Sequence, residues 1–594
     1  MSAAYPNRVF LDNVVPLKGG IDGPQLAGWT PGPAVKSGLG CVLYADQMIP
    51  VDKDVSLAAD VYTPKAAGRY PAIVVFSAYS KELQSSGAPT GTNEIGSPPV
   101  FTGRGYVHVV VARRGMGRSQ GESVVFCNDT DGEDHAKVIA WTAAQPWCDG
   151  NVVLFGTSYY GMSQALVAVK QPPALKGFFS IEMCTDYFRH IVMFGGAPQA
   201  DFLTLWMGAN FTNLQKNLRV PPLARAILSH VFNSPLKHWW WPQVRKRLTR
   251  IMKGFQKKAP TKEMREFWAS IVLDGKTRAT STMAEGPSST LHEINVPFVV
   301  VQNPGHFNLH QFGGYELFRK SSTPTDRKWL IVSAPDYELP CYHWQLEALA
   351  FFDHILFGSA NGYATQAPVR YWRDGARDFS SASDFPIPES KAIRFYLASG
   401  GTDSNTHRLT RADGNTGSNR WAAVPMGALV TAGFDDVANQ ILSYETVADD
   451  DLELTGPINL SLRFSSNEID SHVIARLSRI DTRGNLHPLS LGSIRPACRR
   501  IDEARCTATE IAIDIDTPQP LNRDEPVTLL FSLTPQPVLL KKDEQLRLDV
   551  GSRTDLLISD QTHGRAQFEM QVPPYYSRNK LHYGPDTYVE LRGV

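Results

Sequence analysis

The sequence lacks long hydrophobic runs and an excess of charge of either sign. No stretch of the 594-residue chain has the ~20 continuous apolar residues that a membrane-spanning helix needs. The first residues contain no long apolar core after a basic start, so we expect no secretory signal peptide. The 59 basic and 59 acidic residues cancel, which gives no support for a nucleic-acid or membrane-surface partner.

Cysteine is scarce and scattered. The seven cysteines form no Cys-x-x-Cys pair, and no clustered His and Cys spacing predicts a metal site. Cys498 and Cys506 are near enough in sequence to form a bridge, but we expect free thiols instead. These absences predict a protein without metal or cofactor in a reducing, cytoplasmic compartment.

The first part of the chain has the pattern of a parallel α/β sheet. An apolar strand, Ala72 to Phe76, is followed by a second in GYVHVVVA, a helix in DHAKVIAWTAA and a third strand in NVVLFG. Continuous apolar strands that alternate with helices are typical of a sheet covered on both faces. The strand pattern resumes at VPFVVVQ and KWLIVSA, and the helix LEALAFFDHILFG closes the unit.

The length of the chain predicts more than one unit, because single cores stop growing at roughly 250–300 residues. We assign residues 1–179 and 291–365 to the α/β sheet and residues 180–290, rich in aromatic and basic residues at helical spacing, to a helical cap. After about residue 366 short alternating strands follow, which predict an all-β C-terminal domain, a sandwich or jelly roll, over 366–594.

One motif carries the chemistry: Gly156-Thr157-Ser158-Tyr159-Tyr160-Gly161, between a buried strand and a helix. A serine hydroxyl needs exposure and a base to act as a nucleophile. A sharp strand-to-helix turn supplies the exposure, as in the nucleophile elbow of α/β-hydrolases. The usual second glycine of this motif would fall at position 160, where this chain has Tyr160, and Gly161 follows one position later. The prediction therefore rests on the location of the motif between a strand and a helix. The alternative is a serine that only caps a helix.

An oxyanion site is expected beside this serine. The amide N–H of Tyr159, at the helix N-terminus, would point at the developing negative charge. A second donor must come from the loop after an earlier strand, where Tyr79 lies. Position alone leaves open whether Tyr79 is such a donor or an ordinary loop tyrosine.

At this point the chain resembles the CocE/NonD family, the cocaine-esterase and X-Pro-dipeptidyl-peptidase-like α/β-hydrolases. The resemblance rests on the segments PAIVVFSAYSK, RRGMGRSQGE, AWTAAQPWCDGNVVLFGTSYYGMSQ, AFFDHILFG, PVRYWRDGARDF, NLSLRFSSNEIDSHVIARLSRID and HYGPDTYVEL. It implies a catalytic domain, a helical cap, a C-terminal jelly roll, and hydrolysis of ester or amide bonds. It also implies that Tyr79 completes the oxyanion hole.

Two family positions do not match. The family places an Asp just after the strand matching VPFVVVQ, where this chain has Gln302-Asn303-Pro304-Gly305-His306. Its catalytic His follows the next strand, where residues 332–338 contain no histidine. Leu309-His310 and the run from Gly314 to Arg319 resemble a branch of the family with a Leu-His pair there.

We therefore predict a rearranged triad, because triads are defined by geometry and not by order along the chain. The base would be His310 or His306 from the first loop, with His343 as the fallback. The carboxylate would come from the second loop, Asp336 in preference to Glu338.

Other residues are candidates for substrate binding: Tyr160 beside the serine, Asp186 at the start of the cap, and Trp240 within a run of three tryptophans. The competing interpretations are an ion pair for Asp186 with Arg189, and core packing for the aromatic residues. Arg113 and Arg114 could bind a substrate carboxylate, but a structural salt bridge is the favoured interpretation.

The predicted activity is a serine hydrolase that transfers an acyl group from a small-molecule substrate to water through Ser158. The aromatic cap favours an apolar acyl or alcohol group. An acyltransferase or cyclase with the same serine, and a binding protein with a decayed triad, remain as alternatives. The oligomeric state stays open, since an exposed strand edge in the β domain could pair with a second copy.

Overall fold

The structure is a computed structural model of the chain. It describes residues 42–84, 94–122, 127–199, 286–302, 309–333, 341–400, 406–425, 434–554 and 575–594, and the isolated residues 240, 243, 247 and 573.

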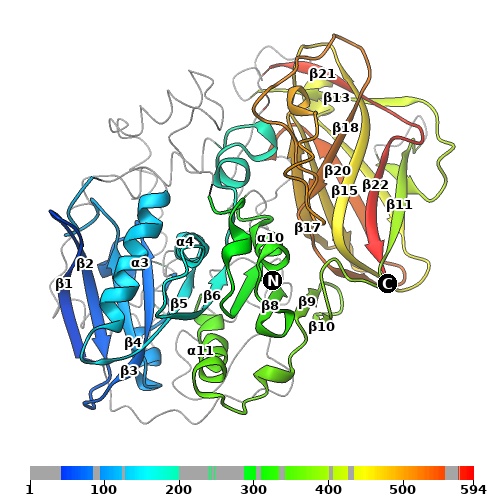
Figure 1. Ribbon diagram of the computed structural model, residues 1–594. Helices are drawn as coiled ribbons and strands as arrows, with labels where there is room; N and C mark the ends of the chain where they lie inside the picture. Colours follow the sequence, from blue (N-terminus) through cyan, green and yellow to red (C-terminus); the bar gives the residue numbers. More distant parts are fainter. Residues whose placement is uncertain are drawn as a thin grey trace.

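The first unit is built on one large sheet with the strand order β1-β2-β4-β3-β5-β6-β7-β8-β9-β10 (Figure 1). Seven neighbouring strands of this sheet run parallel to one another: β4, β3, β5, β6, β7, β8 and β9. The outer strands β1, β2 and β10 are antiparallel to their neighbours. Their bounds are β1 Val42–Asp52, β2 Val55–Thr63, β3 Tyr70–Ser77, β4 Val107–Ala112, β5 Cys148–Thr157, β6 Leu175–Ile181, β7 Phe298–Gln302, β8 Lys328–Val332, β9 Val369–Arg373 and β10 Asp378–Ala382.

Alternate residues of each central strand supply the two faces of this sheet. In β3, Ala72 and Val74 belong to one apolar cluster, whereas Ile73 and Val75 belong to the other. This follows from the two-residue period of a strand. Residues of helices α3 (Asp129–Ala143), α4 (Tyr159–Ala168) and α10 (Gly313–Lys320) join the first cluster, and those of α2 (Pro98–Gly103) and α11 (Cys341–Phe357) join the second.

The second unit is a strand-rich, mostly antiparallel sheet with the order β13-β21-β15-β22-β11-β12-β14-β20-β16-β17, in which β18 and β19 also pair with β15. Its strands are β11 Lys391–Ala398, β12 Thr406–Thr410, β13 Ser418–Ala423, β14 Ile441–Val447, β15 Leu452–Ser466, β16 Val473–Ile480, β17 Leu486–Ile494, β18 Val527–Leu533, β19 Val538–Leu540, β20 Gln545–Gly551, β21 Ser577–His582 and β22 Tyr588–Gly593. A covered α/β sheet followed by an all-β domain confirms the predicted fold class.

The sheet of the first unit continues past residue 366. β9 pairs in parallel with β8, and β10 pairs with β9, so both belong to the first sheet. Short strands have the same sequence pattern whichever sheet they join, so the sequence could not assign them. We propose that the boundary between the units lies between β10 and β11.

Shorter elements connect these parts. They are α1 (Lys81–Gln84), η2 (Phe188–Val192), η3 (Phe194–Gly196), η6 (Leu291–Glu293), η7 (Thr325–Arg327), η8 (Tyr363–Thr365), α12 (Phe434–Ala438) and η10 (Pro496–Cys498). Most of the predicted cap lies outside the described residues, which include only 240, 243 and 247 between 200 and 285.

The two units share apolar packing. One buried cluster contains residues of both sheets, and the ring of Tyr315 on α10 stacks on Phe385, in the connection between β10 and β11, with 5.0 Å between ring centroids. Figure 1 shows η2 and η3, in teal, between the first sheet and the β domain. The short helix η3 packs against β17 of the β domain.

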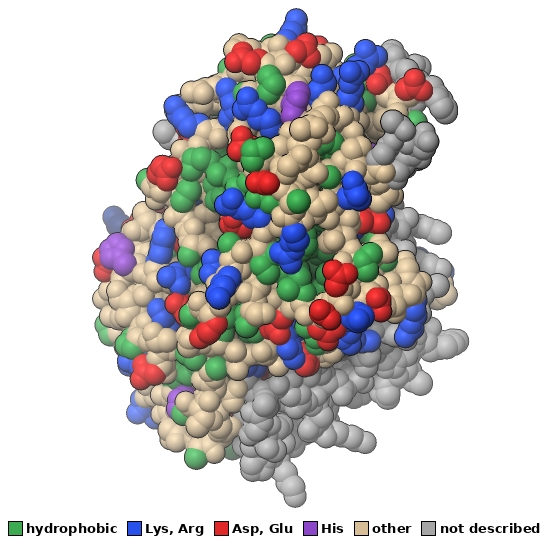
Figure 2. All heavy atoms as spheres, turned by 90° about the vertical axis from the view of Figure 1, so that its right-hand side faces the viewer, with side chains coloured by type: hydrophobic (Ala, Val, Ile, Leu, Met, Phe, Trp, Pro, Cys, Tyr) green, Lys and Arg blue, Asp and Glu red, His purple; other side chains and the backbone are tan. Residues whose placement is uncertain are grey.

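On the face seen in Figure 2, lysine and arginine side chains are interspersed with aspartate and glutamate. This matches the balanced charge of the sequence. Among the described helices, none combines the length and the apolar character needed to cross a membrane.

Candidate active site

Ser158 lies at a strained turn between β5 and α4. Its φ of 58° and ψ of −117° are rare for a residue with a side chain. Its N–H donates to the Ile181 carbonyl (2.9 Å), and its carbonyl accepts the Met162 N–H (2.8 Å). The turn is thus fixed by strand β6 on one side and by helix α4 on the other, and it leaves the Ser158 side chain half-buried.

Two glycines make this turn sterically possible. A Cβ atom on Gly156, which has φ 146°, would lie 2.5 Å from the Cβ of Tyr160. A Cβ atom on Gly161 would lie 2.8 Å from the carbonyl oxygen of Ile181. Gly161 therefore lets α4 approach β6, which explains why the second glycine of the motif occurs at this position.

The ring of His310 lies beside Ser158. Its Nε2 lies 3.1 Å from Ser158 Oγ, within hydrogen-bond distance. It follows β7, and its backbone φ of 56° is in the left-handed region. Of the candidate histidines, His306 and the side chain of His343 lie outside the described residues, as do Asp336 and Glu338.

Burial favours the neutral form of the His310 ring. The side chain is 3% exposed, and burial lowers the pKa of the imidazole to about 3 because the cation loses its water. A neutral ring can accept the proton of the serine hydroxyl at physiological pH. A carboxylate beside it would stabilise the imidazolium that forms.

Tyr79 follows β3 and lies against the elbow. Its ring centroid is 5.8 Å from that of Tyr159 and 5.8 Å from that of Tyr160. The loop is anchored next to it by Lys81, whose buried ammonium is 2.7 Å from Asp46 and 2.8 Å from Asp60. The half-buried Tyr79 phenol is therefore held at the carboxyl edge of the sheet, beside the residues that follow Ser158.

The Tyr159 side chain is buried and bonds two charged residues, Arg113 and Asp131. Its phenol accepts a hydrogen bond from Arg113 and donates one to Asp131 (3.3 Å), and Arg113 also pairs with Asp131 (3.3 Å). Arg113 is 1% exposed. The predicted structural salt bridge is thus present at Arg113, and Arg114 likewise pairs with Asp134 (2.5 Å).

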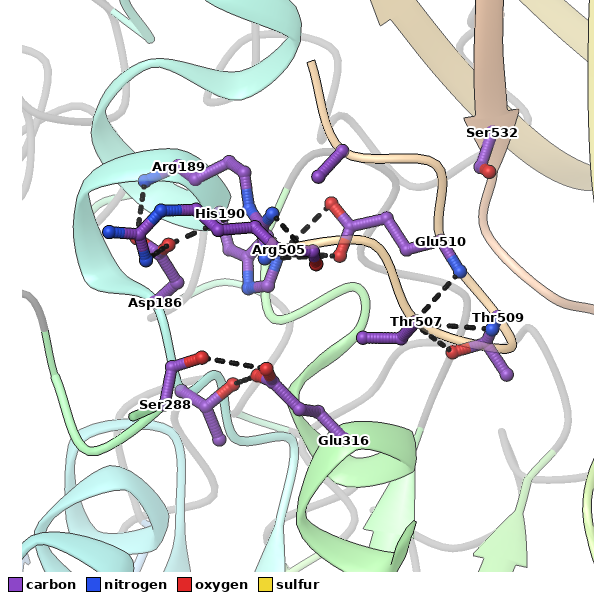
Figure 3. A network of polar contacts seen from close by, with 12 residues as sticks. Asp186, Arg189, His190, Ser288, Glu316, Arg505, Thr507, Thr509, Glu510 and Ser532 are labelled. Atoms are coloured by element: carbon purple, nitrogen blue, oxygen red, sulfur yellow. Dashed lines mark hydrogen bonds and ion pairs between the residues drawn. The ribbon is translucent and has the colours of Figure 1, made fainter. Parts of the chain in front are cut away.

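Tyr160 and Asp186, two predicted substrate-binding residues, are both buried. Tyr160 is 1% exposed and belongs to the apolar cluster on the α11 side of the sheet. Asp186 accepts the N–H of Arg189 (3.0 Å) and lies 3.5 Å from Arg505 of the β domain (Figure 3). The third, Trp240, is half-buried, and the residues next to it lie outside the described part of the chain.

Sequence reasoning missed a buried pair of carboxyl groups near the elbow. The carbonyl of Glu94 accepts the Thr157 N–H (3.0 Å), and Glu182 follows β6 with φ 50°. Burial, together with the negative charge of Glu182, raises the pKa of Glu94 well above its usual range. No sequence signal indicates this pair, since the two residues are far apart in the chain.

Gln302, noted in the sequence only as a missing Asp, contacts the histidine loop directly. Its side-chain Nε2 donates to the carbonyl of His310, and its Oε1 accepts the Gly314 N–H (2.9 Å). The residue at the end of β7 therefore supports the backbone of the base. Within the described residues, no cluster of His, Cys, Asp or Glu could hold a metal ion.

The chain matches two known protein-family models. Residues 52–334 match the family model described as X-Pro dipeptidyl-peptidase (S15 family), and residues 361–571 match the X-Pro dipeptidyl-peptidase C-terminal non-catalytic domain. The chain is 26% identical over 488 residues to a cocaine esterase from Rhodococcus sp. (strain MB1 Bresler), an alignment that covers 75% of this chain and 82% of the relative.

Solved structures have the same fold. A CocE/NonD family hydrolase from Staphylococcus aureus matches with a TM-score of 0.70 and 22% identity over 93% of this chain and 94% of that one. An α-amino acid ester hydrolase matches with a TM-score of 0.64 and 17% identity over 98% and 100% of the two chains. The resemblance predicted from the sequence is confirmed: the chain belongs to the CocE/NonD-type family of α/β-hydrolases and is a serine hydrolase that acts on ester or amide bonds.

Proposed function

We propose that Ser158 is the nucleophile of this hydrolase and that His310 is its general base. The observation that carries the proposal is the 3.1 Å separation between Ser158 Oγ and His310 Nε2 at a strained strand-to-helix turn. Two residues 152 positions apart meet there, and each has a positive φ that costs about 1–3 kcal/mol. Such strain is typical of active sites.

The reaction has two steps. Ser158 Oγ attacks the substrate carbonyl carbon while His310 Nε2 takes the hydroxyl proton, and the leaving alcohol or amine then departs with that proton. Water next attacks the acyl-enzyme, gives its proton to the same imidazole, and releases the carboxylic acid and the free serine.

The oxyanion of each tetrahedral intermediate would accept hydrogen bonds from the Tyr159 amide and the Tyr79 phenol. Tyr159 opens helix α4, and the first N–H groups of a helix have no partner within the helix. The ring contacts of Tyr79 with Tyr159 and Tyr160 support its place beside that amide. The buried Tyr160 would then support Tyr79 instead of touching substrate.

The group that orients His310 would come from the loop after β8. That loop leaves the same edge of the sheet as the loop with His310, because β7 and β8 are parallel. Asp336 is our candidate there, with Glu338 as the second choice.

The proposed partner is a small acyl ester or amide with an apolar acyl or alcohol group. The names of the relatives, a cocaine esterase and an α-amino acid ester hydrolase, favour esters as the first test substrates. We also propose a reducing, cytoplasmic compartment, which the free thiols of Cys127, Cys148, Cys184, Cys498 and Cys506 support.

A fluorophosphonate probe and a p-nitrophenyl ester test the proposal. Ser158→Ala should abolish both labelling and hydrolysis, and His310→Ala should lower kcat by about 10³-fold or more, on the scale of other triads. His306→Ala is the matched control and should retain activity. If His306→Ala is inactive and His310→Ala active, the base is His306; if the wild type is not labelled, Ser158 is no nucleophile. Products formed with an added alcohol separate hydrolysis from acyl transfer.

A further inference from the structure

The backbone around His310 is held in a conformation that it would not adopt alone. His310 has φ 56°, although it carries a side chain, and lies in a short segment between β7 and α10. A left-handed residue of this kind persists only where its surroundings fix it. The contacts that fix it therefore decide where the imidazole points.

The first support comes from the catalytic sheet. Gln302 at the end of β7 is fully buried and uses both atoms of its side-chain amide on this segment, one on the His310 carbonyl and one on the Gly314 N–H.

The second support comes from the β domain. Thr534, just after β18, donates its hydroxyl hydrogen bond to Oε1 of Gln311, the residue next to His310. Gln311 Nε2 in turn donates to the Leu309 carbonyl on the other side of His310 (2.8 Å). Thr534 and Gln311 are both fully buried, so water does not compete for these bonds.

Thr534 is itself fixed within the β domain. Its N–H donates to the Leu491 carbonyl (3.2 Å), and its own carbonyl accepts a hydrogen bond from Ser490. The next residue, Pro535, accepts a hydrogen bond from the phenol of Tyr315 on α10 (3.0 Å). The backbone of Thr534, whose hydroxyl bonds Gln311, is thus itself hydrogen-bonded to strand β17.

A neighbouring contact joins the same two parts of the molecule. His190 of η2 lies 3.1 Å from Glu510 of the β domain (Figure 3). The His190 ring also packs on Phe312, with 5.6 Å between ring centroids. Phe312 is two residues after His310. The β domain thus contacts the histidine segment through Thr534 and, by way of His190, through Phe312.

We propose that Thr534 and Gln311 are positioning residues through which the C-terminal β domain holds His310 at hydrogen-bond distance from Ser158. This inference rests on the proposed roles of Ser158 and His310. It gives a part in the reaction to a domain whose family model is described as non-catalytic. Neither residue touches the reacting atoms, and both act through the backbone of His310.

The test compares Thr534→Val with Thr534→Ser in the full chain. Valine keeps the shape but removes the hydroxyl, whereas serine restores it. We expect Thr534→Val to lower kcat by roughly 10- to 100-fold with KM changed less than about threefold, since misplacing a catalytic group by about 1 Å costs rate on this scale. Thr534→Ser should recover kcat to within about threefold. The number of active sites is measured by titration with the fluorophosphonate over a long incubation. The kcat of each variant is then calculated per labelled, folded molecule.

Thr528→Val on β18 is the matched control, because Thr528 is exposed and lies on the strand that leads to Thr534; it should keep the wild-type kcat. Gln311→Met is a second variant, since it keeps the length of the side chain but offers no amide to accept from Thr534 or to donate to the Leu309 carbonyl. It should also lower kcat at unchanged KM.

Unchanged kcat in Thr534→Val, or no recovery in Thr534→Ser, overturns the inference. A failure of the proposed function gives a different result, because Ser158→Ala or His310→Ala would then keep activity whatever happens at Thr534.

Discussion

Arg113 donates a hydrogen bond to the phenol oxygen of Tyr159, the residue that follows Ser158 in the elbow. Asp131, which also forms the capping box of α3 with Asn128, pairs with both of them. These bonds connect the turn at Ser158 to the end of β4 and to the first turn of α3. Within Tyr159, the side chain has a structural role and the amide is our candidate for the catalytic one.

Tyr159→Phe separates these two roles. The variant keeps the amide and the ring but removes the hydroxyl, which leaves Arg113 and Asp131 to pair with each other. We expect the free energy of unfolding in urea to fall by about 1–3 kcal/mol, the cost of an unsatisfied buried polar group. The kcat of the folded enzyme should stay within a few-fold of wild type. A hundredfold loss of kcat at unchanged stability would contradict this division.

Gly156→Ala should damage the elbow itself. The new Cβ would lie 2.5 Å from the Cβ of Tyr160 and 3.1 Å from the Glu94 carbonyl oxygen, in addition to the cost of φ 146°. We expect a loss of several kcal/mol, on the scale of about 1–3 kcal/mol for overpacking plus a similar backbone term, and at least a tenfold loss of fluorophosphonate labelling rate.

Gly150→Ala is the control for this substitution. Gly150 also has a positive φ, 97°, but no heavy atom outside its chain neighbours lies within 4 Å of the place that a Cβ atom would take. It should lose about 1–2 kcal/mol of stability from the backbone alone and keep its labelling rate. Equal labelling by the two variants would mean that the close contact at Gly156 is relieved without disturbing Ser158.

Buried neutral histidines should make the fold sensitive to acid. Burial lowers the pKa of His108, His135 and His472 to about 3, from an ordinary value of 6.5. Below pH 6.5 the unfolded chain binds protons at these sites and the folded chain does not until about pH 3. Their contribution to stability is therefore complete above pH 6.5 and is lost as the pH falls toward 3.

His135→Phe tests one of these sites, because the His135 ring stacks on Phe76 at 4.8 Å and a phenyl ring can replace it. Urea unfolding between about pH 7 and 5 should show a pH slope smaller by up to about 1.4 kcal/mol per pH unit. His135→Leu, which also removes the titratable ring, should reduce the slope by the same amount. An unchanged slope in His135→Phe would show that this ring is protonated in the folded state.

Glu510→Gln should weaken the junction between the units. Glu510 lies 3.3 Å from Arg189 and 3.1 Å from His190, and although burial opposes its charge, these two residues lower the pKa of its carboxyl group. Removal of one partner of a buried ion pair costs about 3–5 kcal/mol, which thermal or urea unfolding would detect. Glu503→Gln, nearby but exposed, should change stability by less than about 0.5 kcal/mol.

Local patterns were enough to predict much of the fold. The apolar run in β3 and the helical spacing in α3 correspond to observed elements, as does the strand–turn–helix around Ser158. Each of these patterns lies within a short stretch of the chain, so it can be recognised without the tertiary structure. The same local signals could not assign β9 and β10 to a sheet, because a partner strand is chosen by long-range packing.

The sequence by itself determined the class of fold, the family and the elbow serine, since glycine spacing and apolar periodicity are local properties of the chain. Only the tertiary structure decided that His310 reaches Ser158, that Gln302 holds the segment with His310, and that Thr534 joins it from 223 residues beyond Gln311. The physical reason is that a hydrogen bond between distant residues depends on how whole units pack. No short stretch of sequence contains that information.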